Sequence, residues 1–164
     1  GDNMNEFIKK NISIIIAIII ILSIIIILNT YNSKILFKMT RESWSNGYIC
    51  RGYTIDSWGV IEEYDVQNKN DKLKTAKISK EELNKLNELI DKVKDSYEEN
   101  EKMFQSCDWG SIKYEIYSHN LSKWVLLSSE DDIKRGKNLS DASEEILELT
   151  DKLYNKYIKE KLRN

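Results

Sequence analysis

Two cysteines, Cys50 and Cys107, are the only thiols in this chain of 164 residues. Cys50 falls inside an expected strand and Cys107 directly before another, which places both beside regular structure. In an exported protein, a disulfide between them would close a loop worth about 4 kcal/mol in the chain-entropy model. Free cysteine is also among the residue types most often found buried. The sequence therefore leaves two interpretations open, a Cys50–Cys107 disulfide and two small buried side chains.

Few residues could support metal binding or catalysis. His119 is the only histidine, and a zinc site would need it together with both cysteines and Asp108, without the short spacings typical of zinc ligands. Glu62 and Glu63 are neighbours in an expected strand, so they point to opposite faces and cannot act together as acid and base. We expect no metal, no cofactor and no enzymatic activity. An enzyme would require an unrecognised site built from Asp, Glu, Tyr or Ser.

Aromatic side chains are concentrated in expected turns and at expected strand edges. Such side chains either complete a small core or form a binding surface. Exposure of two or more indoles together would favour a protein or glycan partner. The residues predicted to contribute to a partner-binding surface are Trp44, Tyr48, Tyr53, Trp58 and Trp109.

The charge balance argues against nucleic acid as a partner. The chain has 25 basic and 27 acidic residues and a formal net charge of -2. Binding to phosphate backbones needs an excess of lysine and arginine on one face. We therefore expect a protein partner and no nucleic acid.

Residues 12–28, with the sequence ISIIIAIIIILSIIIIL, form the strongest pattern in the chain. No charged residue occurs between Lys10 and Lys34, and a helix needs roughly 20 apolar residues to cross a hydrocarbon layer about 30 Å thick. A core helix would carry a polar stripe, and a cleaved signal peptide would need small residues after Leu28. We therefore expect a transmembrane helix that contacts the lipid bilayer through residues 12–28.

The short tail that ends in Lys9 and Lys10 is typical of a signal anchor, which leaves its N-terminus in the cytoplasm. This arrangement predicts a single-pass protein of a bacterial cell membrane with an extracytoplasmic C-terminal domain. The expected divisions are a tail at 1–10, a transmembrane helix at 11–30, a juxtamembrane segment or first strand at 31–43, and a soluble α+β domain at 44–164.

Alternation of apolar and polar residues predicts the strands of the remaining chain. They are expected at 34–40, 48–55, 60–66, 109–116 and 123–129. Residues 67–74 are expected to form a solvated loop, and a second polar loop is expected around Gly136. The amphipathic helical pattern that precedes residues 98–101 does not continue through this acidic run.

Two amphipathic helices are expected after these strands. Ser79 and Glu82 have the spacing of a capping box, which predicts that the first helix begins at Ser79. The second is expected from Ser140, and its apolar face carries Ile146, Leu149, Leu153 and Tyr157.

Strands precede a helix twice, and Trp58-Gly59-x-Ile61 recurs as Trp109-Gly110-x-Ile112. A ββα-ββα arrangement makes an antiparallel sheet with two helices on one face. The predicted fold is therefore α+β, with an N-terminal transmembrane helix followed by a small two-layer domain.

The segments YTIDSWGVIEEY and ISKEELNKLNELI, a Trp-Gly strand pair and a last helix follow one another between residues 48 and 157. This order of elements resembles that of the emfourin-type inhibitors of metalloproteases. The glycine-rich stretch that opens those inhibitors is absent here, so no functional residue is transferred from them.

Together these patterns predict a membrane-anchored interaction module that binds a protein at the cell surface, as an inhibitor, an immunity factor or a sensor. A tether would raise the effective concentration of such a module near the membrane. The alternatives are an accessory subunit that associates through its transmembrane helix, and an enzyme with an unrecognised site.

Overall fold

The computed structural model of the protein describes residues 11–12, 14–24, 34–43, 50–67, 71–102 and 110–160. The chain divides into two compact units, Gly1–Ser33 and Lys34–Asn164. Each unit is described by itself.

The N-terminal unit corrects the prediction of a transmembrane helix. Residues 11–12 and 14–24 are helical, and the Ser23 hydroxyl donates a hydrogen bond to the Ile19 carbonyl at 2.7 Å. At about 1.5 Å per residue, the helical stretch 14–24 extends roughly 16 Å, about half of a hydrocarbon layer. Within the described residues, no helix is both long and apolar enough to cross a membrane.

This finding corrects the expected fold and the expected location in the cell membrane. The transmembrane helix of the predicted fold, the signal anchor and the single-pass location in the cell membrane are not supported. The division at 11–30 and the bilayer contact through residues 12–28 extend over residues that the structure does not describe, so both stay predictions. The alternative of an accessory subunit is a statement about function and stays a prediction. The prediction took the whole uncharged run as one helix, whereas the structure describes helix at residues 11–12 and 14–24.

The second unit contains all the described strands. They are β1 (Ile35–Ser43), β2 (Arg51–Asp56), β3 (Val60–Asp65), β4 (Lys72–Lys77), β5 (Tyr97–Glu101), β6 (Gly110–Ser118), β7 (Lys123–Glu130) and β8 (Lys134–Asn138). The helices of this unit are α2 (Lys80–Ile90), α3 (Asp141–Tyr154) and the π-helical turn η1 (Asn155–Lys159).

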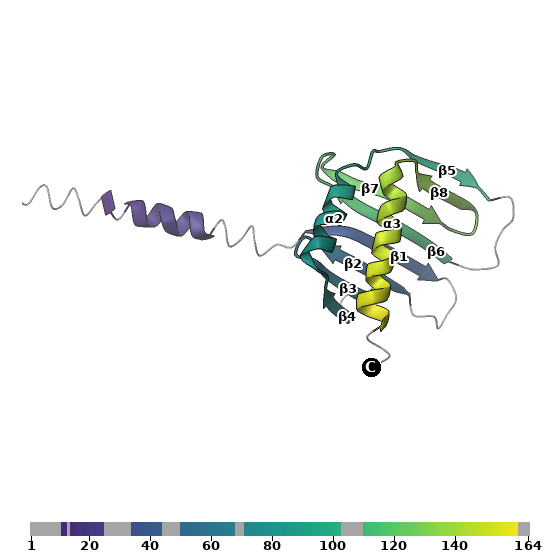
Figure 1. The fold of residues 1–164 in the computed structure, drawn as a ribbon, viewed down its shortest axis with the longest axis horizontal. Coiled ribbons are helices and arrows are strands. Elements are labelled where there is room, and N and C mark those ends of the chain that lie inside the picture. Colours follow the sequence, from purple (N-terminus) through teal and green to yellow (C-terminus); the bar gives the residue numbers. More distant parts are fainter. Residues whose placement is uncertain are drawn as a thin grey trace, which may run out of the picture. The chain divides into compact units, whose positions relative to one another are not determined.

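The strands form one antiparallel sheet in the order β4-β3-β2-β1-β6-β7-β8-β5. At its centre β1 pairs with β6, with Phe37 opposite Ile116 and Met39 opposite Tyr114. Helices α2 and α3 cover one face of the sheet, as Figure 1 shows. The domain therefore has two layers, and no described helix of this unit covers the opposite face.

The core lies between the sheet and the two helices. Alternate strand residues point toward the helices, and Phe37, Ile55, Ile61 and Ile116 are each 0% exposed. The helices contribute residues that recur every three or four positions, as an amphipathic face requires. These are Leu86, Leu89 and Ile90 from α2 and Ile146 and Leu153 from α3.

The predicted start of the first amphipathic helix is confirmed. The Ser79 hydroxyl accepts a hydrogen bond from the Glu82 backbone N–H at 3.2 Å, and a Glu82 carboxylate oxygen accepts one from the Ser79 N–H at 2.9 Å. Ser140 is likewise the N-cap residue of α3. The Ser140 side chain makes no capping hydrogen bond, so local capping chemistry accounts for the start of α2 alone.

Three strands occupy segments that were expected to be irregular. The first half of β4 lies in the expected loop at 67–74, β5 contains the acidic run, and β8 contains Gly136. β4 and β5 are the two edges of the sheet, and β8 is next to an edge. Their polar side chains are mostly exposed, so the sequence lacks the apolar alternation that marks a half-buried strand.

The internal repeat expected from the two Trp-Gly pairs is absent. Gly59 lies in the turn between β2 and β3, with a φ of 75° that favours glycine, whereas Gly110 is the first residue of β6. Four described strands, β1 to β4, precede α2, and four more, β5 to β8, lie between α2 and α3, whereas two were expected before each helix. The ββα-ββα arrangement is therefore wrong, although the sheet is antiparallel as expected.

Candidate protein-binding surface

One end of the sheet collects the beginning of β1, the β2–β3 turn and the β6–β7 turn. Ile35 pairs with Asp56 at the end of β2, and Ser118 pairs with Lys123 at the end of the β6–β7 hairpin. Because β1 pairs with both β2 and β6, these segments meet at the same edge of the molecule. We call this surface the aromatic end and define it as Ile35, Trp58, Tyr117, His119, Leu121 and Trp124.

Hydrogen bonds hold the turn that carries Trp58. The Asp56 carboxylate accepts bonds from the backbone N–H groups of Trp58 at 2.9 Å and Val60 at 2.8 Å. The Gly59 N–H donates to the Asp56 carbonyl at 2.9 Å. An aspartate that bonds to the backbone after it is a standard means of fixing a turn. The backbone of Trp58 is therefore well fixed.

The start of β1 is joined to the same turn. The Ser57 N–H donates to the Lys34 carbonyl at 2.8 Å, and the Lys34 N–H donates to the Ser57 hydroxyl at 3.0 Å. These reciprocal bonds keep Ile35, the next residue, beside the β2–β3 turn.

Ring contacts organise the β6–β7 hairpin. Tyr117 packs edge to face against Trp124 on the paired position of β7, with ring centroids 5.8 Å apart, and against His119 at 5.4 Å. The Asn120 side chain donates a hydrogen bond to the Asp91 carbonyl at 3.2 Å, which connects the hairpin to the end of α2. Such ring pairs contribute about 0.5–1.5 kcal/mol beyond burial, so they also restrict the indole of Trp124.

Large apolar side chains are unusually exposed at the aromatic end. Ile35, Trp58, Leu121 and Trp124 are 41%, 45%, 41% and 43% exposed. Among the described residues of the second unit, the other large apolar side chains in this class are Leu73, Ile133 and Leu139, which come from three different segments. The aromatic end is therefore the place where exposed apolar residues gather.

The sheet face opposite the helices has a different character. Lys38 on β1 lies opposite Glu115 on β6 and Thr54 on β2, and Thr54 lies opposite Glu62 on β3. These cross-strand neighbours are polar or charged and half-buried, which is typical of a solvated sheet face. The centre of this face is therefore polar, and the apolar residues are confined to its end.

Two tyrosines lie across glycines on this polar face. A Cβ added to Gly52 would come within 2.5 Å of the Tyr64 ring, and one added to Gly136 would come within 2.3 Å of the Tyr97 ring. Tyr97 on β5 thereby reaches over β8, and its hydroxyl hydrogen-bonds to the Ser129 hydroxyl on β7. Glycine has no side chain, and in each pair the tyrosine ring covers the part of the sheet that the glycine leaves uncovered.

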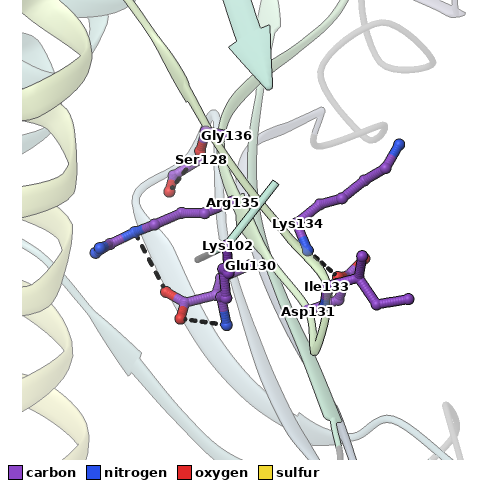
Figure 2. A network of polar contacts seen from close by, with 8 residues as sticks. All are labelled: Lys102, Ser128, Glu130, Asp131, Ile133, Lys134, Arg135 and Gly136. Carbon is purple, nitrogen blue, oxygen red and sulfur yellow. Dashed lines mark hydrogen bonds and ion pairs between the residues drawn. The ribbon is translucent and has the colours of Figure 1, made fainter. Parts of the chain in front are cut away.

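A charged network closes the β7–β8 hairpin at the other end of the sheet, as Figure 2 shows. Glu130 lies between Lys102 at 2.8 Å and Arg135 at 3.5 Å, and the hydrogen bond from Lys102 lowers the pKa of the Glu130 carboxyl. The Asp131 carboxylate accepts bonds from the Ile133 and Lys134 N–H groups at 2.8 and 2.7 Å. These carboxylates are engaged within the hairpin, so we assign them a structural role.

A second network lies inside the domain. Glu63 is 1% exposed and accepts a hydrogen bond from the Tyr154 hydroxyl, and its Oε1 lies 3.5 Å from Arg51 Nη1. The Tyr154 ring stacks on Tyr53 with centroids 4.6 Å apart. Burial raises the pKa of both tyrosines, and the hydrogen bond to Glu63 raises that of Tyr154 further. This network joins α3 to β2 and β3.

The structure separates the aromatic residues that the sequence grouped together. Trp58 lies at the aromatic end and is exposed, whereas Tyr53 is 2% exposed and packs in the core. The remaining three, Trp44, Tyr48 and Trp109, lie outside the described residues.

The predicted disulfide falls partly outside the described residues as well. Cys50 is buried, and its carbonyl accepts a hydrogen bond from the Val66 N–H at 2.7 Å. Cys107 lies in a stretch that the structure does not describe, so the Cys50–Cys107 bridge stays a prediction.

Sequence reasoning missed most of the aromatic end. Trp124 was placed in a strand but was not recognised as a surface residue. The pattern contained the signal, because Val125 is buried on the helix side and the preceding residue must point to the other face. Ile35 and Leu121 gave no comparable signal, since their exposure depends on strand order.

Comparison with known protein families, curated proteins and solved structures finds no match for the chain. The resemblance to emfourin-type inhibitors therefore rests on element order alone.

Proposed function

We propose that the domain from Lys34 onward is a protein-binding module whose binding surface is the aromatic end. The observation that carries this proposal is the clustering of Ile35, Trp58, Leu121 and Trp124, each exposed by more than two fifths, on adjoining segments of one sheet end. Exposed apolar clusters are a common feature of protein interfaces. Tryptophan is also strongly enriched among the residues that dominate binding energy.

The rigidity of the surface supports the same conclusion. Trp58 sits in a turn held by Asp56, and Trp124 is packed against Tyr117. Residues held in place before binding lose less conformational freedom when a partner docks. The arrangement therefore suits a preformed contact more than a surface that orders on binding.

The partner we infer is a folded protein that presents an apolar patch. An apolar partner surface would cover the four exposed side chains, while Lys34 and Lys123 at the margin would remain in the polar rim. Binding of this kind fits an inhibitor, an immunity factor or a sensor.

Site-specific photo-crosslinking of the full chain in its own cells tests this proposal. A photoreactive phenylalanine analogue would replace Trp58 in one variant and Trp124 in another. Ile133, which is 56% exposed on the β7–β8 hairpin, provides the matched control position. We expect positions 58 and 124 to trap the same protein, and position 133 not to trap it.

The purified partner then provides a quantitative measurement. Trp58→Ala and Trp124→Ala should each weaken its binding at least tenfold, since a central tryptophan commonly contributes more than 1.4 kcal/mol to an interface. Ile133→Ala should leave the affinity unchanged. The absence of a shared adduct, or equal trapping from position 133, would overturn the proposal.

A further inference from the structure

The two edge strands of the sheet carry opposite charges. β4 contains Lys72, Lys74 and Lys77, and β5 contains Glu98, Glu99 and Glu101. Within the described part of the chain, β4 pairs only with β3, and β5 pairs only with β8. An edge strand presents a row of backbone donors and acceptors that another strand can use. From these edges we propose that one molecule pairs its β4 with the β5 of a second copy, so that the chain self-associates head to tail.

The direction of the strands permits this pairing. All seven strand contacts in the eight-stranded sheet are antiparallel, so β4 and β5, at its two ends, run in opposite directions. A second copy placed beside the first in the same orientation would therefore continue the antiparallel pattern. Its helices would also lie on the same side of the extended sheet.

The strands are similar in length and accessible. β4 has 6 residues and β5 has 5. Lys72 and Lys77 on β4 and Glu98, Glu99 and Glu101 on β5 are exposed. Opposite charges at facing positions of neighbouring strands are favourable, and like charges are unfavourable.

Charge also selects this pairing over the symmetric alternatives. A twofold axis would place β4 against β4 or β5 against β5, and would bring lysines against lysines or glutamates against glutamates. Only the β4–β5 contact joins opposite charges. A single strand pair is a small interface, so we expect weak association that depends on protein concentration and falls with salt.

Charge-reversal variants of the full chain test the proposal. One variant, K72E/K77E, makes both edges acidic, and the other, E98K/E101K, makes both edges basic. Each should reduce self-association at least tenfold in analytical ultracentrifugation. An equimolar mixture should restore complexes, since the acidic β4 of one variant then faces the basic β5 of the other.

Control variants carry the same charge change away from the edges. K85E/K92E matches the first variant, and E144K/E148K matches the second, because all four of these residues are exposed on or next to α2 and α3. The N-terminal unit is the same in every protein, so any association through it is common to all of them. Circular dichroism verifies that each variant is folded, and the neutral pair K72Q/K77Q replaces K72E/K77E if that variant is not.

We expect the control variants to associate as the unchanged chain does. The control variants and the unchanged chain should all lose association at 0.5 M salt. Failure of the mixture to form complexes, or equal losses in the control variants, would overturn the proposal. The purified chain alone is used, so the result is independent of whether the aromatic end binds a partner.

Discussion

The hydroxyl of Tyr154 on α3 donates a hydrogen bond to the buried carboxylate of Glu63 on β3. These two residues are 91 positions apart in the sequence, and the bond connects the last α-helix to the first half of the sheet. Arg51, which is half exposed, provides the positive charge nearby. A buried carboxylate without such partners would be costly, so this contact contributes to holding α3 against the sheet.

Tyr154→Phe removes the hydroxyl and keeps the ring that stacks on Tyr53. We expect it to lower the free energy of unfolding by about 1–3 kcal/mol, because Glu63 then loses a buried hydrogen bond. Urea denaturation measures the change, with Tyr117→Phe at the aromatic end as the control. The double variant with Glu63→Gln should cost less than the sum of its parts. Equal stability of Tyr154→Phe and the unchanged protein would contradict this role.

Glu82 should make the domain sensitive to acid. Partial burial raises the pKa of its carboxyl, but hydrogen bonds from Lys156, the Ser79 N–H and Tyr157 outweigh that effect and lower the pKa to about 2. A lowered folded-state pKa contributes stability that is complete above the unfolded value near 4.5 and is lost as the pH falls toward 2.

Glu82→Gln should therefore flatten the dependence of unfolding free energy on pH between about 4.5 and 2. At neutral pH it should cost about 1–2 kcal/mol, less than the full linkage value because solvent partly screens the pair with Lys156. Thermal unfolding at a series of pH values measures both effects. Glu145→Gln, on the exposed side of α3, should retain the slope of the unchanged protein.

Gly136 should resist substitution because the ring of Tyr97 occupies the space of a side chain. Gly136→Ala places its Cβ within 2.3 Å of that ring and 2.9 Å of the Glu98 carbonyl oxygen. We expect a loss of about 1–3 kcal/mol. Tyr97→Ala should partly relieve the clash, so a double-mutant cycle should give a coupling energy of at least about 0.5 kcal/mol. Additive effects would show that the two positions are independent.

The aromatic end should tolerate substitutions that the core does not. Trp58→Ala should change the unfolding free energy by less than about 0.5 kcal/mol, because the indole is exposed. Phe37→Ala should cost about 3–5 kcal/mol, because Phe37 is completely buried. Chemical denaturation compares the two. A large loss from Trp58→Ala would mean that this residue stabilises the fold.

Local chemistry made part of this fold predictable from sequence. The capping box of Ser79 and Glu82 depends on two residues three positions apart, and the alternation around Ile55 depends on its nearest neighbours. Both are properties of short segments. The same kind of pattern placed Trp58 in a turn.

Long-range contacts were not predictable in the same way. Nothing local to β1 indicates that its second neighbour is β6, and this pairing decides that Ile35 and Leu121 reach the same end of the sheet. Tyr53 was grouped with the surface aromatics because composition alone does not show that Tyr154 covers it. The prediction of a transmembrane helix rested on apolar composition, which does not determine where a helix begins or ends.

The central pairing of β1 with β6 has a consequence for biosynthesis. Phe37 reaches its partner Ile116 only after some 80 further residues have been made. Until then the first four strands emerge from the ribosome with one long flank of β1 unpaired. Closing so large a loop is slow compared with forming a hairpin. The nascent chain therefore passes through a stage at which its most central strand is temporarily an outer one.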